Sequence, residues 1–288
     1  MIQNCQDALA INHYHQRADL FLTATANPKW PKIQEALLPG QSASDRPDII
    51  CCVFHFKMAQ LIKDIYEHGI IGCTVAQVWT NEFQKKGLPH MHMVIFLHPD
   101  HKLCTPEDVD SLLLQSFQMK NEGPELFELV KTLMVHTPCG PKHHNADAPC
   151  PVNGKCSKSF PKSFRDQTTV NDDSYANLQR CDTGKTFEVR GHQVNNLWVV
   201  AHCHYLIYKY HCHINVESIA LIKAIKYIST RAMITLQWSL VTVRMRLSSI
   251  LILNMSLPVR VFGIFSISIC TRKAHQWSVS KSILKVNK

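Results

Sequence analysis

Acidic side chains are missing from the last fifth of this 288-residue chain. The last one is Glu217, and residues 229–288 contain nine of the 31 lysine and arginine residues but none of the 22 acidic residues. The whole surplus of +9 therefore belongs to this tail, whereas residues 1–228 carry equal numbers of positive and negative side chains. A positive surplus is typical of proteins that bind nucleic acids, but the balanced charge of residues 1–228 gives that part no such indication.

The chain also lacks features of membrane, secreted and ATP-driven proteins. It has no run of about 20 uncharged apolar residues, since the best candidate, 247–270, is interrupted by Asn254, Pro258 and Arg260. The first 20 residues contain no apolar signal segment, and no Gly-x4-Gly-Lys-Ser/Thr loop is present to bind ATP. With 12 cysteines and no export signal, we expect thiols or metal ligands rather than disulfides. A nuclear or cytoplasmic location without a membrane partner is expected, and a membrane-associated tail is the weaker alternative.

Two histidines lie near the start of an apolar, β-favouring segment, residues 87–97. Because side chains alternate along a strand, His90 and His92 are predicted to share one face, with Met91 and Met93 packed on the other. Two imidazoles on one sheet face are able to hold a divalent metal ion. The simpler alternative is a pair of edge-strand histidines with no metal.

The segment before the histidines is predicted to supply a further ligand. Residues 74–84 favour a strand, and 85–87 favour a hairpin turn into the next strand. Glu82 and Gln84 share one face of this predicted strand, so each is a candidate third ligand for the metal.

One histidine and three cysteines form a second candidate metal site in an irregular insert, residues 136–165. His136, Cys139, Cys150 and Cys156 are a ligand set able to hold a tetrahedral structural Zn²⁺. Their spacing is not that of a standard zinc finger, His143 and His144 are competing ligands, and a loop with scattered thiols is the alternative. Basic side chains in the same insert are candidates for phosphate contact and Phe160 for base stacking, against the alternative of a solvated basic loop. The DNA-binding candidates are Lys155, Lys158, Phe160, Lys162 and Arg165.

The hydrophobic pattern predicts a mixture of helices and strands rather than repeats. Strands are predicted over 21–26, 74–84 and 205–216 and within 87–97, with a hairpin within 186–200. Helices are predicted over 1–20, 32–38, 47–68, 106–117, 124–135 and 218–228.

Several stretches together resemble one known family. The central one is Phe-Gln-Lys-Lys-Gly-Leu-Pro-His-Met-His at 83–92, which is similar to the His-hydrophobic-His signature of rolling-circle replication initiators. In order along the chain, residues 21–23, 27–31, 36–41, 45–48, 105–108, 154–158, 198–200 and 213–217 also match. From about Gln3 to Ile228 the chain thus resembles the nuclease of Helitron transposases, the Helitron helicase-like domain.

The resemblance implies a fold and a chemistry. The implied fold is α/β (α+β) of the HUH-nuclease type, a mainly antiparallel sheet flanked by helices, with the Cys/His-rich insert. The resemblance also implies that residues 1–228 form one domain. The chemistry is nicking and strand transfer of single-stranded DNA with Mg²⁺ or Mn²⁺, in which Tyr227 is the nucleophile and Lys223 assists one turn earlier. The family carries a second tyrosine four residues later, where this chain has Arg231, so a single-tyrosine nick is expected. The family's separate helicase motor is absent, so this chain is not expected to bind ATP.

The resemblance ends at Ile228, and we hypothesise that the tail is read one base out of register. For one choice of codons, the family's His-Lys-Gly-His-Asp becomes Thr-Arg-Ala-Met, found at 230–233, and a later family segment becomes the sequence at 259–265. Such a shift would also remove acidic residues. Aspartate and glutamate codons begin with GA, and one base out of register these bases fall in codons for other residues, such as arginine, serine and asparagine. A genuine basic DNA-binding tail is the alternative. The predicted function is that of a truncated transposable-element endonuclease, active or decayed; the alternative is a non-catalytic DNA- or zinc-binding protein derived from the transposon.

Overall fold

The computed structural model divides the chain into two compact units, which we describe separately. The first unit comprises residues 1–102 and 219–288, and the second comprises residues 103–218. The residues predicted as one family domain span both units. The structure describes residues 11, 14–15, 18–83, 87–117, 123–139, 150–152, 155–170, 176–218, 241–243 and 264–269.

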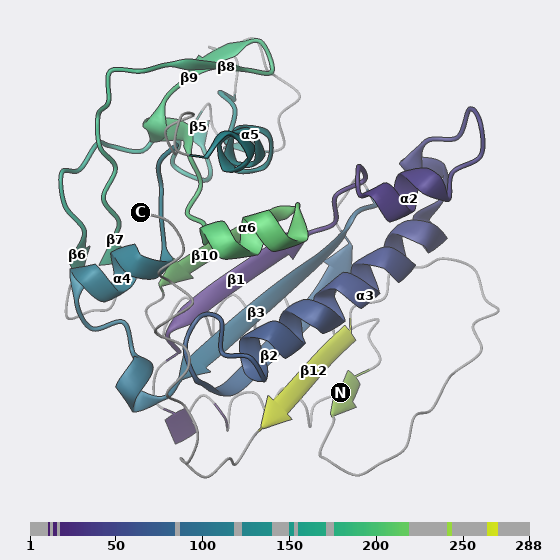
Figure 1. Ribbon diagram of the computed structural model, residues 1–288, viewed down its shortest axis with the longest axis horizontal. Helices are drawn as coiled ribbons and strands as arrows, with labels where there is room; N and C mark the ends of the chain where they lie inside the picture. Colours follow the sequence, from purple (N-terminus) through teal and green to yellow (C-terminus); the bar gives the residue numbers. More distant parts are fainter. Residues whose placement is uncertain are drawn as a thin grey trace. The chain divides into compact units, whose positions relative to one another are not determined.

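The first unit is built on a mainly antiparallel sheet, as the sequence predicts (Figure 1). Strand β3 (Pro89–Leu97) lies between β1 (Leu20–Thr25) and β2 (Thr74–Phe83) and is antiparallel to both. Two segments of the tail extend this sheet: β12 (Ile264–Ile269) is antiparallel to β2, and β11 (Val241–Val243) is parallel to β12.

Two α-helices follow β1 in the first unit. α2 (Pro31–Glu35) and α3 (Pro47–Tyr66) both begin with proline, whose fixed φ and missing N–H suit the first helical turn. The short 3-10 helix η1 (Ala43–Asp45) connects them, and η2 (Pro99–His101) follows β3. α3 agrees with the prediction over 47–68 to within two residues, and α2 ends three residues earlier than predicted.

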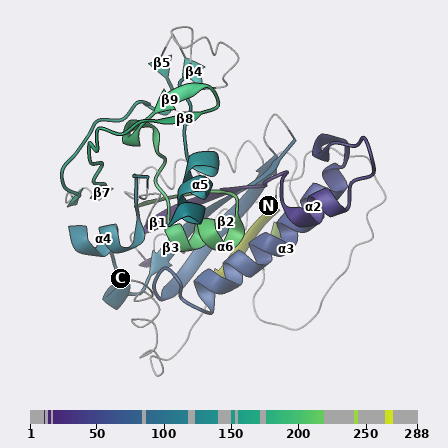
Figure 2. The same cartoon turned by 45° about the horizontal axis from the view of Figure 1, so that its top comes forward.

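The two faces of the sheet are covered differently. Figures 1 and 2 show α3 running along β2 and β3, which it contacts. Val94 and Phe96, on one face of β3, belong to a hydrophobic cluster that contains no residue of α3. α3 therefore covers the opposite face, where Met91 and Met93 are fully buried as predicted. The histidine side of β3 is thus the side away from α3.

The second unit contains short elements around its own hydrophobic core. Its helices are α4 (Pro106–Leu112), α5 (Pro124–Leu133), the 3-10 helix η4 (Asn196–Trp198) and α6 (His204–Tyr210). Its strands are β4 (Pro151–Val152), β5 (Lys155–Cys156), β6 (Thr169–Val170), β7 (Ala176–Asn177), β8 (Phe187–Val189), β9 (His192–Val194) and β10 (His213–Ser218). The hairpin predicted within 186–200 is β8–β9.

The prediction of a strand over 205–216 is wrong in its first half, where α6 forms. Leu206, Ile207 and Tyr210 are buried at helical spacing, so packing selects the helix over the β preference of the aromatic and branched residues. His211, at φ 49°, ends the helix in the left-handed conformation, and β10 follows. α4 is also shorter than predicted, because Leu114 leaves the helix to form a β-bridge with His202.

Arg180 is a buried cation that ties together the core of the second unit, with 1% of its surface exposed. Its guanidinium donates to the carbonyl oxygens of Asn196 and Val199 and to the side-chain oxygen of Gln115. Burial, followed by repulsion from Arg165, lowers the pKa of Arg180 to about 10. The positive charge of Arg180 is therefore stabilised by the dipoles of carbonyl and amide groups rather than by a carboxylate.

We predict that Arg180→Met destabilises the second unit by roughly 2–5 kcal/mol, because two buried carbonyl oxygens and the half-buried Gln115 side chain lose their donor. Urea unfolding followed by hydrogen exchange of peptides from residues 103–218 measures the effect. Arg165→Met is the matched control, because Arg165 is exposed and hydrogen-bonds Arg180 through its backbone, so this variant removes only a repulsive charge. Equal stability of the two variants would contradict this role for Arg180.

Among the described residues, no helix is long and apolar enough to cross a membrane.

Candidate metal centres

Strand register places His90 and His92 in two rows that cross the first unit's sheet. His90 is paired with Thr25 on β1 and with Glu82 on β2. His92 is paired with Thr23 on β1 and Thr80 on β2. Because directly opposed residues of antiparallel strands share a face, all six side chains lie on the side of the sheet away from α3.

Glu82, His90 and His92 meet closely enough to hold one metal ion. Their ligand atoms all lie within 4.8 Å of one another, and Glu82 Oε1 is 2.8 Å from His92 Nε2. The two imidazole centroids are 4.4 Å apart, with the ring planes at 76°. Both histidines are buried, while Glu82 is partly exposed. The prediction of Glu82 as a partner of the histidine pair therefore agrees with the geometry, whereas Gln84 lies outside the described residues.

Thr25 orients His90, and sequence reasoning missed it. Its hydroxyl oxygen lies 2.6 Å from Nδ1 of His90, so the ligand that His90 would offer a metal is Nε2. Such a hydrogen bond to the second ring nitrogen is the usual way in which proteins orient a metal-binding histidine. Phe21 stacks on the ring of His92, with centroids 5.7 Å apart and planes at 13°. The only signal for these contacts is the register of two strands about 65 residues apart.

Two imidazoles and one carboxylate on one face fit a divalent transition metal with open coordination positions. The 2.8 Å contact between Glu82 and His92 requires a proton between the two atoms. A metal bound by both side chains would take the place of that proton, which a neutral imidazole would then carry on Nδ1.

The two residues proposed from the family resemblance for the covalent step, Tyr227 and Lys223, lie outside the described residues.

The four predicted zinc ligands come together in the second unit. The ligand atoms of His136, Cys139, Cys150 and Cys156 all lie within 4.8 Å of one another. Nε2 of His136 is 3.3 Å from the sulfur of Cys156 and 3.7 Å from that of Cys150. The backbone fixes two of these positions, since the His136 N–H donates to Trp198 O and Ser157 N–H donates to Cys150 O.

Protonation in this cluster is compatible with metal binding. Burial, followed by repulsion from Lys158 and Lys162, lowers the pKa of His136 and favours its neutral ligand form. Burial opposes ionisation of Cys156, but hydrogen bonds from the backbone of Phe160 and Lys158 and from the thiols of Cys139 and Cys150 together outweigh it and lower its pKa. Burial, followed by hydrogen bonds with the neighbouring thiols, raises the pKa of Cys139 to about 12, so a metal must displace that proton. Three thiols beside an imidazole are the donor set that Zn²⁺ prefers.

The predicted base-stacking residue, Phe160, is occupied within the protein. Its ring stacks on His136 with centroids 4.5 Å apart, and it also packs against the core of the second unit. The ammonium of Lys162 lies 5.1 Å from the ring centroid and donates to the carbonyl of Lys158 at 2.8 Å. These contacts support the metal cluster from one side.

The remaining DNA-binding candidates are less constrained. Lys158 and Arg165 are exposed, and their role in phosphate contact stays a prediction. Lys155 lies on β5, where the structure describes the backbone but not this side chain.

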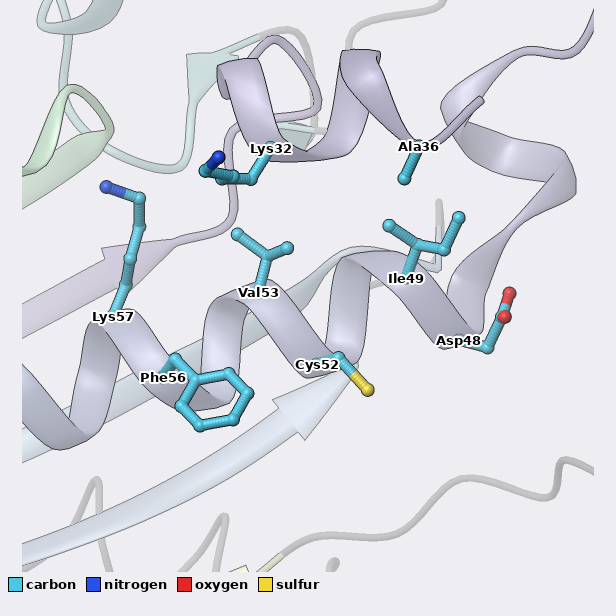
Figure 3. A pocket seen from close by; sticks show the side chains of 8 residues that line it. All are labelled: Lys32, Ala36, Asp48, Ile49, Cys52, Val53, Phe56 and Lys57. Carbon is cyan, nitrogen blue, oxygen red and sulfur yellow. The ribbon is translucent and has the colours of Figure 1, made fainter. Parts of the chain in front are cut away.

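A pocket of about 490 Å³ lies between α2 and α3, and none of the metal-cluster residues lines it (Figure 3). It is mainly apolar, and its lining includes neither histidine nor carboxylate of the Glu82 cluster. Its lysines already have partners: Lys32 pairs with Glu35 at 3.2 Å, and Lys57 lies over the ring of Trp30. The lining residues are Lys32, Ala36, Asp48, Ile49, Cys52, Val53, Phe56 and Lys57.

Comparison with known families supports the resemblance over the first third of the chain. The family model described as the Helitron helicase-like domain at the N-terminus matches residues 1–95. The match includes Thr25, Glu82, His90 and His92 and ends before the zinc cluster. No curated protein matches the chain.

Proposed function

We propose that this chain, which carries a Helitron helicase-like domain over residues 1–95, is a metal-dependent nuclease that nicks single-stranded DNA. The observation that carries the proposal is the meeting of Glu82, His90 and His92 on one sheet face, with ligand atoms within 4.8 Å. A Helitron-related domain suggests DNA as the partner, and the donor set suits Mn²⁺ or Mg²⁺. When bound, such an ion would polarise the scissile phosphate and stabilise charge on its oxygens.

The chain's own residues would then act as follows. Thr25 would hold His90 in its ligating orientation, and Glu82 would bring the negative charge that a dication needs. The Tyr227 oxygen, after losing its proton, would attack phosphorus, and the bond from phosphorus to the 3′ oxygen would break. The products would be a 5′-phosphotyrosine and a 3′ hydroxyl, which takes up a proton. Lys223 is proposed to assist by favouring the phenolate.

A nicking assay on labelled single-stranded DNA with Mn²⁺ tests this proposal. Wild-type protein is expected to form a covalent adduct that survives denaturing electrophoresis. Tyr227→Phe should form none, because it lacks the attacking oxygen. His90→Ala should reduce the yield more than the roughly 10–100-fold that loss of an outer-shell partner costs, because it removes a ligand itself.

Matched controls separate chemistry from folding. His55→Ala, on the exposed side of α3, and Tyr208→Phe, on α6 of the second unit, change the same residue types at positions outside the proposed ligands and nucleophile. Both are expected to keep the adduct yield of the wild type. No adduct from folded wild-type protein, or an equal yield from His90→Ala, would overturn the proposal.

We propose a structural zinc site as a second function, on the observation that four soft ligands converge in the second unit. This function does not need the nuclease chemistry, so it would persist in a decayed transposase copy. If wild-type protein binds zinc but forms no DNA adduct, the non-catalytic alternative is the better description of this chain.

A further inference from the structure

Thr80 carries a buried hydroxyl without a hydrogen-bond partner beside the proposed metal ligands. Its side chain is 4% exposed, and Oγ1 has no partner among the atoms of the protein. A buried hydroxyl that makes no hydrogen bond costs free energy, commonly about 1–3 kcal/mol. Native proteins rarely keep such a group unless another state of the molecule uses it.

Strand register places this hydroxyl on the metal-binding face. Thr80 is the β2 partner of His92, and it lies two residues before Glu82, so both β2 side chains are on that face. The other partnerless polar side chains that the structure describes on β2 belong to Gln77, Trp79 and Asn81. The side chains of those three lie on the opposite face. Among the described residues of β2, Thr80 is therefore the one with a buried, partnerless polar atom on the histidine side.

Each of the two rows across the sheet therefore places a threonine hydroxyl beside a histidine. In the first row, the hydroxyl of Thr25 is already bonded to His90 at 2.6 Å. In the second row, Thr80 lies beside His92, and its hydroxyl makes no hydrogen bond. A metal held by two imidazoles and a carboxylate keeps oxygen ligands in its other positions, and a neighbouring hydroxyl is suited to donate to one of them.

We propose that Thr80 is a positioning residue that donates a hydrogen bond to an oxygen ligand of the metal bound by Glu82, His90 and His92. The oxygen is a phosphate oxygen when DNA is bound; in the DNA-free protein a metal-bound water takes its place and donates to the Thr80 hydroxyl instead. This inference rests on the proposed function and adds a residue to it. It also accounts for the isolated hydroxyl, which gains its partner only in the loaded state.

The test compares Thr80→Val, which keeps the shape and removes the hydroxyl, with Thr80→Ser, which keeps the hydroxyl. Mn²⁺ affinity is measured from the electron paramagnetic resonance signal of free Mn²⁺, and metal-free stability from thermal unfolding. Thr80→Val is expected to bind Mn²⁺ roughly tenfold more weakly, as for other outer-shell partners. Thr80→Ser is expected to stay within about threefold of the wild type, since the donor is retained.

The metal-free proteins give a readout that a purely structural threonine would not. Without metal, Thr80→Val should unfold at the same temperature as the wild type or higher, because it removes an unsatisfied buried group. Thr74→Val on the same strand is the matched control. Its hydroxyl lies 3.5 Å from the carbonyl of Ile65, so this variant should lose stability and keep Mn²⁺ affinity.

The outcomes distinguish the two proposals. If Mn²⁺ binding is lost in His90→Ala but unchanged in Thr80→Val, only the role of Thr80 is overturned, and the proposed nuclease function stands. Equal losses in Thr80→Val and Thr80→Ser, or a lower metal-free unfolding temperature for Thr80→Val, would also overturn it. Failure of the wild-type protein to bind Mn²⁺ would overturn the proposed nuclease function together with this inference.

Discussion

Cys156→Ser is expected to abolish stoichiometric zinc binding and to unfold much of the second unit at temperatures where the wild type is folded. The sulfur of Cys156 lies 3.3 Å from Nε2 of His136, and its lowered pKa favours the thiolate that a metal binds. A structural zinc supplies about 10–16 kcal/mol of apparent binding free energy in small zinc domains, which is as large as the stability of a typical domain. Serine keeps the size of the side chain but is a poor zinc ligand.

Metal content and hydrogen exchange measure this effect together. Purified wild-type protein should contain about one zinc per chain, and a chelator should reproduce the exchange pattern of Cys156→Ser. Cys181→Ser is the control, because Cys181 is a half-buried free thiol of the same unit outside the cluster. Stoichiometric zinc in Cys156→Ser, or a wild type that takes up none, would refute the zinc site.

The histidine–glutamate cluster was largely predictable because its parts are close in sequence. Alternation along residues 87–97 and a short turn at Gly87 are enough to place His90 and His92 beside the end of the preceding strand. Alternation alone puts Glu82 and Gln84 on the same face, so it left both as candidates for the third metal ligand. The pairing register, with Glu82 opposite His90, favours Glu82. A turn with one residue more or fewer would have placed both Glu82 and Gln84 on the face away from the histidines.

The contacts that sequence reasoning missed are those made by distant strands. Thr25 and Thr80 are ordinary strand threonines until β1 and β2 pair with β3 in one register, and local patterns do not contain that information. α6 was mispredicted for a related reason. Tyr205, Ile207 and Tyr208 favour strands by themselves, and only the burial of Leu206, Ile207 and Tyr210 against the second unit selects a helix.

The second unit is expected to lose stability steeply as the pH falls from about 6.5 towards 4. His202 is fully buried, and this burial lowers its pKa to about 3 although its Nδ1 donates to the carbonyl of Val200. The half-buried His204 and His213 have pKa values lowered to about 4, also chiefly by burial. In the unfolded chain each histidine has a pKa near 6.5.

The sign of the effect follows from proton uptake. Between pH 6.5 and the folded pKa, the unfolded chain binds a proton that the folded chain does not, so acid favours unfolding. Stability is complete above about pH 6.5, falls by about 1.4 kcal/mol per pH unit for each such histidine, and levels off below the folded pKa. His202 alone would cost roughly 5 kcal/mol by pH 3, which is comparable to the whole stability of a marginal domain.

Urea unfolding of the second unit, followed by hydrogen exchange at pH 7, 6, 5 and 4, would measure this dependence. His202→Leu removes one titrating group and should lower the proton uptake on unfolding by about one, so its stability falls less steeply with acid. His192→Leu, at a half-buried position on β9, controls for losing a histidine elsewhere in the unit. If both variants kept the wild-type slope, burial of His202 would not be the source of the acid sensitivity. Because the comparison depends on the difference between two slopes, protonation of the zinc ligands contributes equally to both and does not obscure the result.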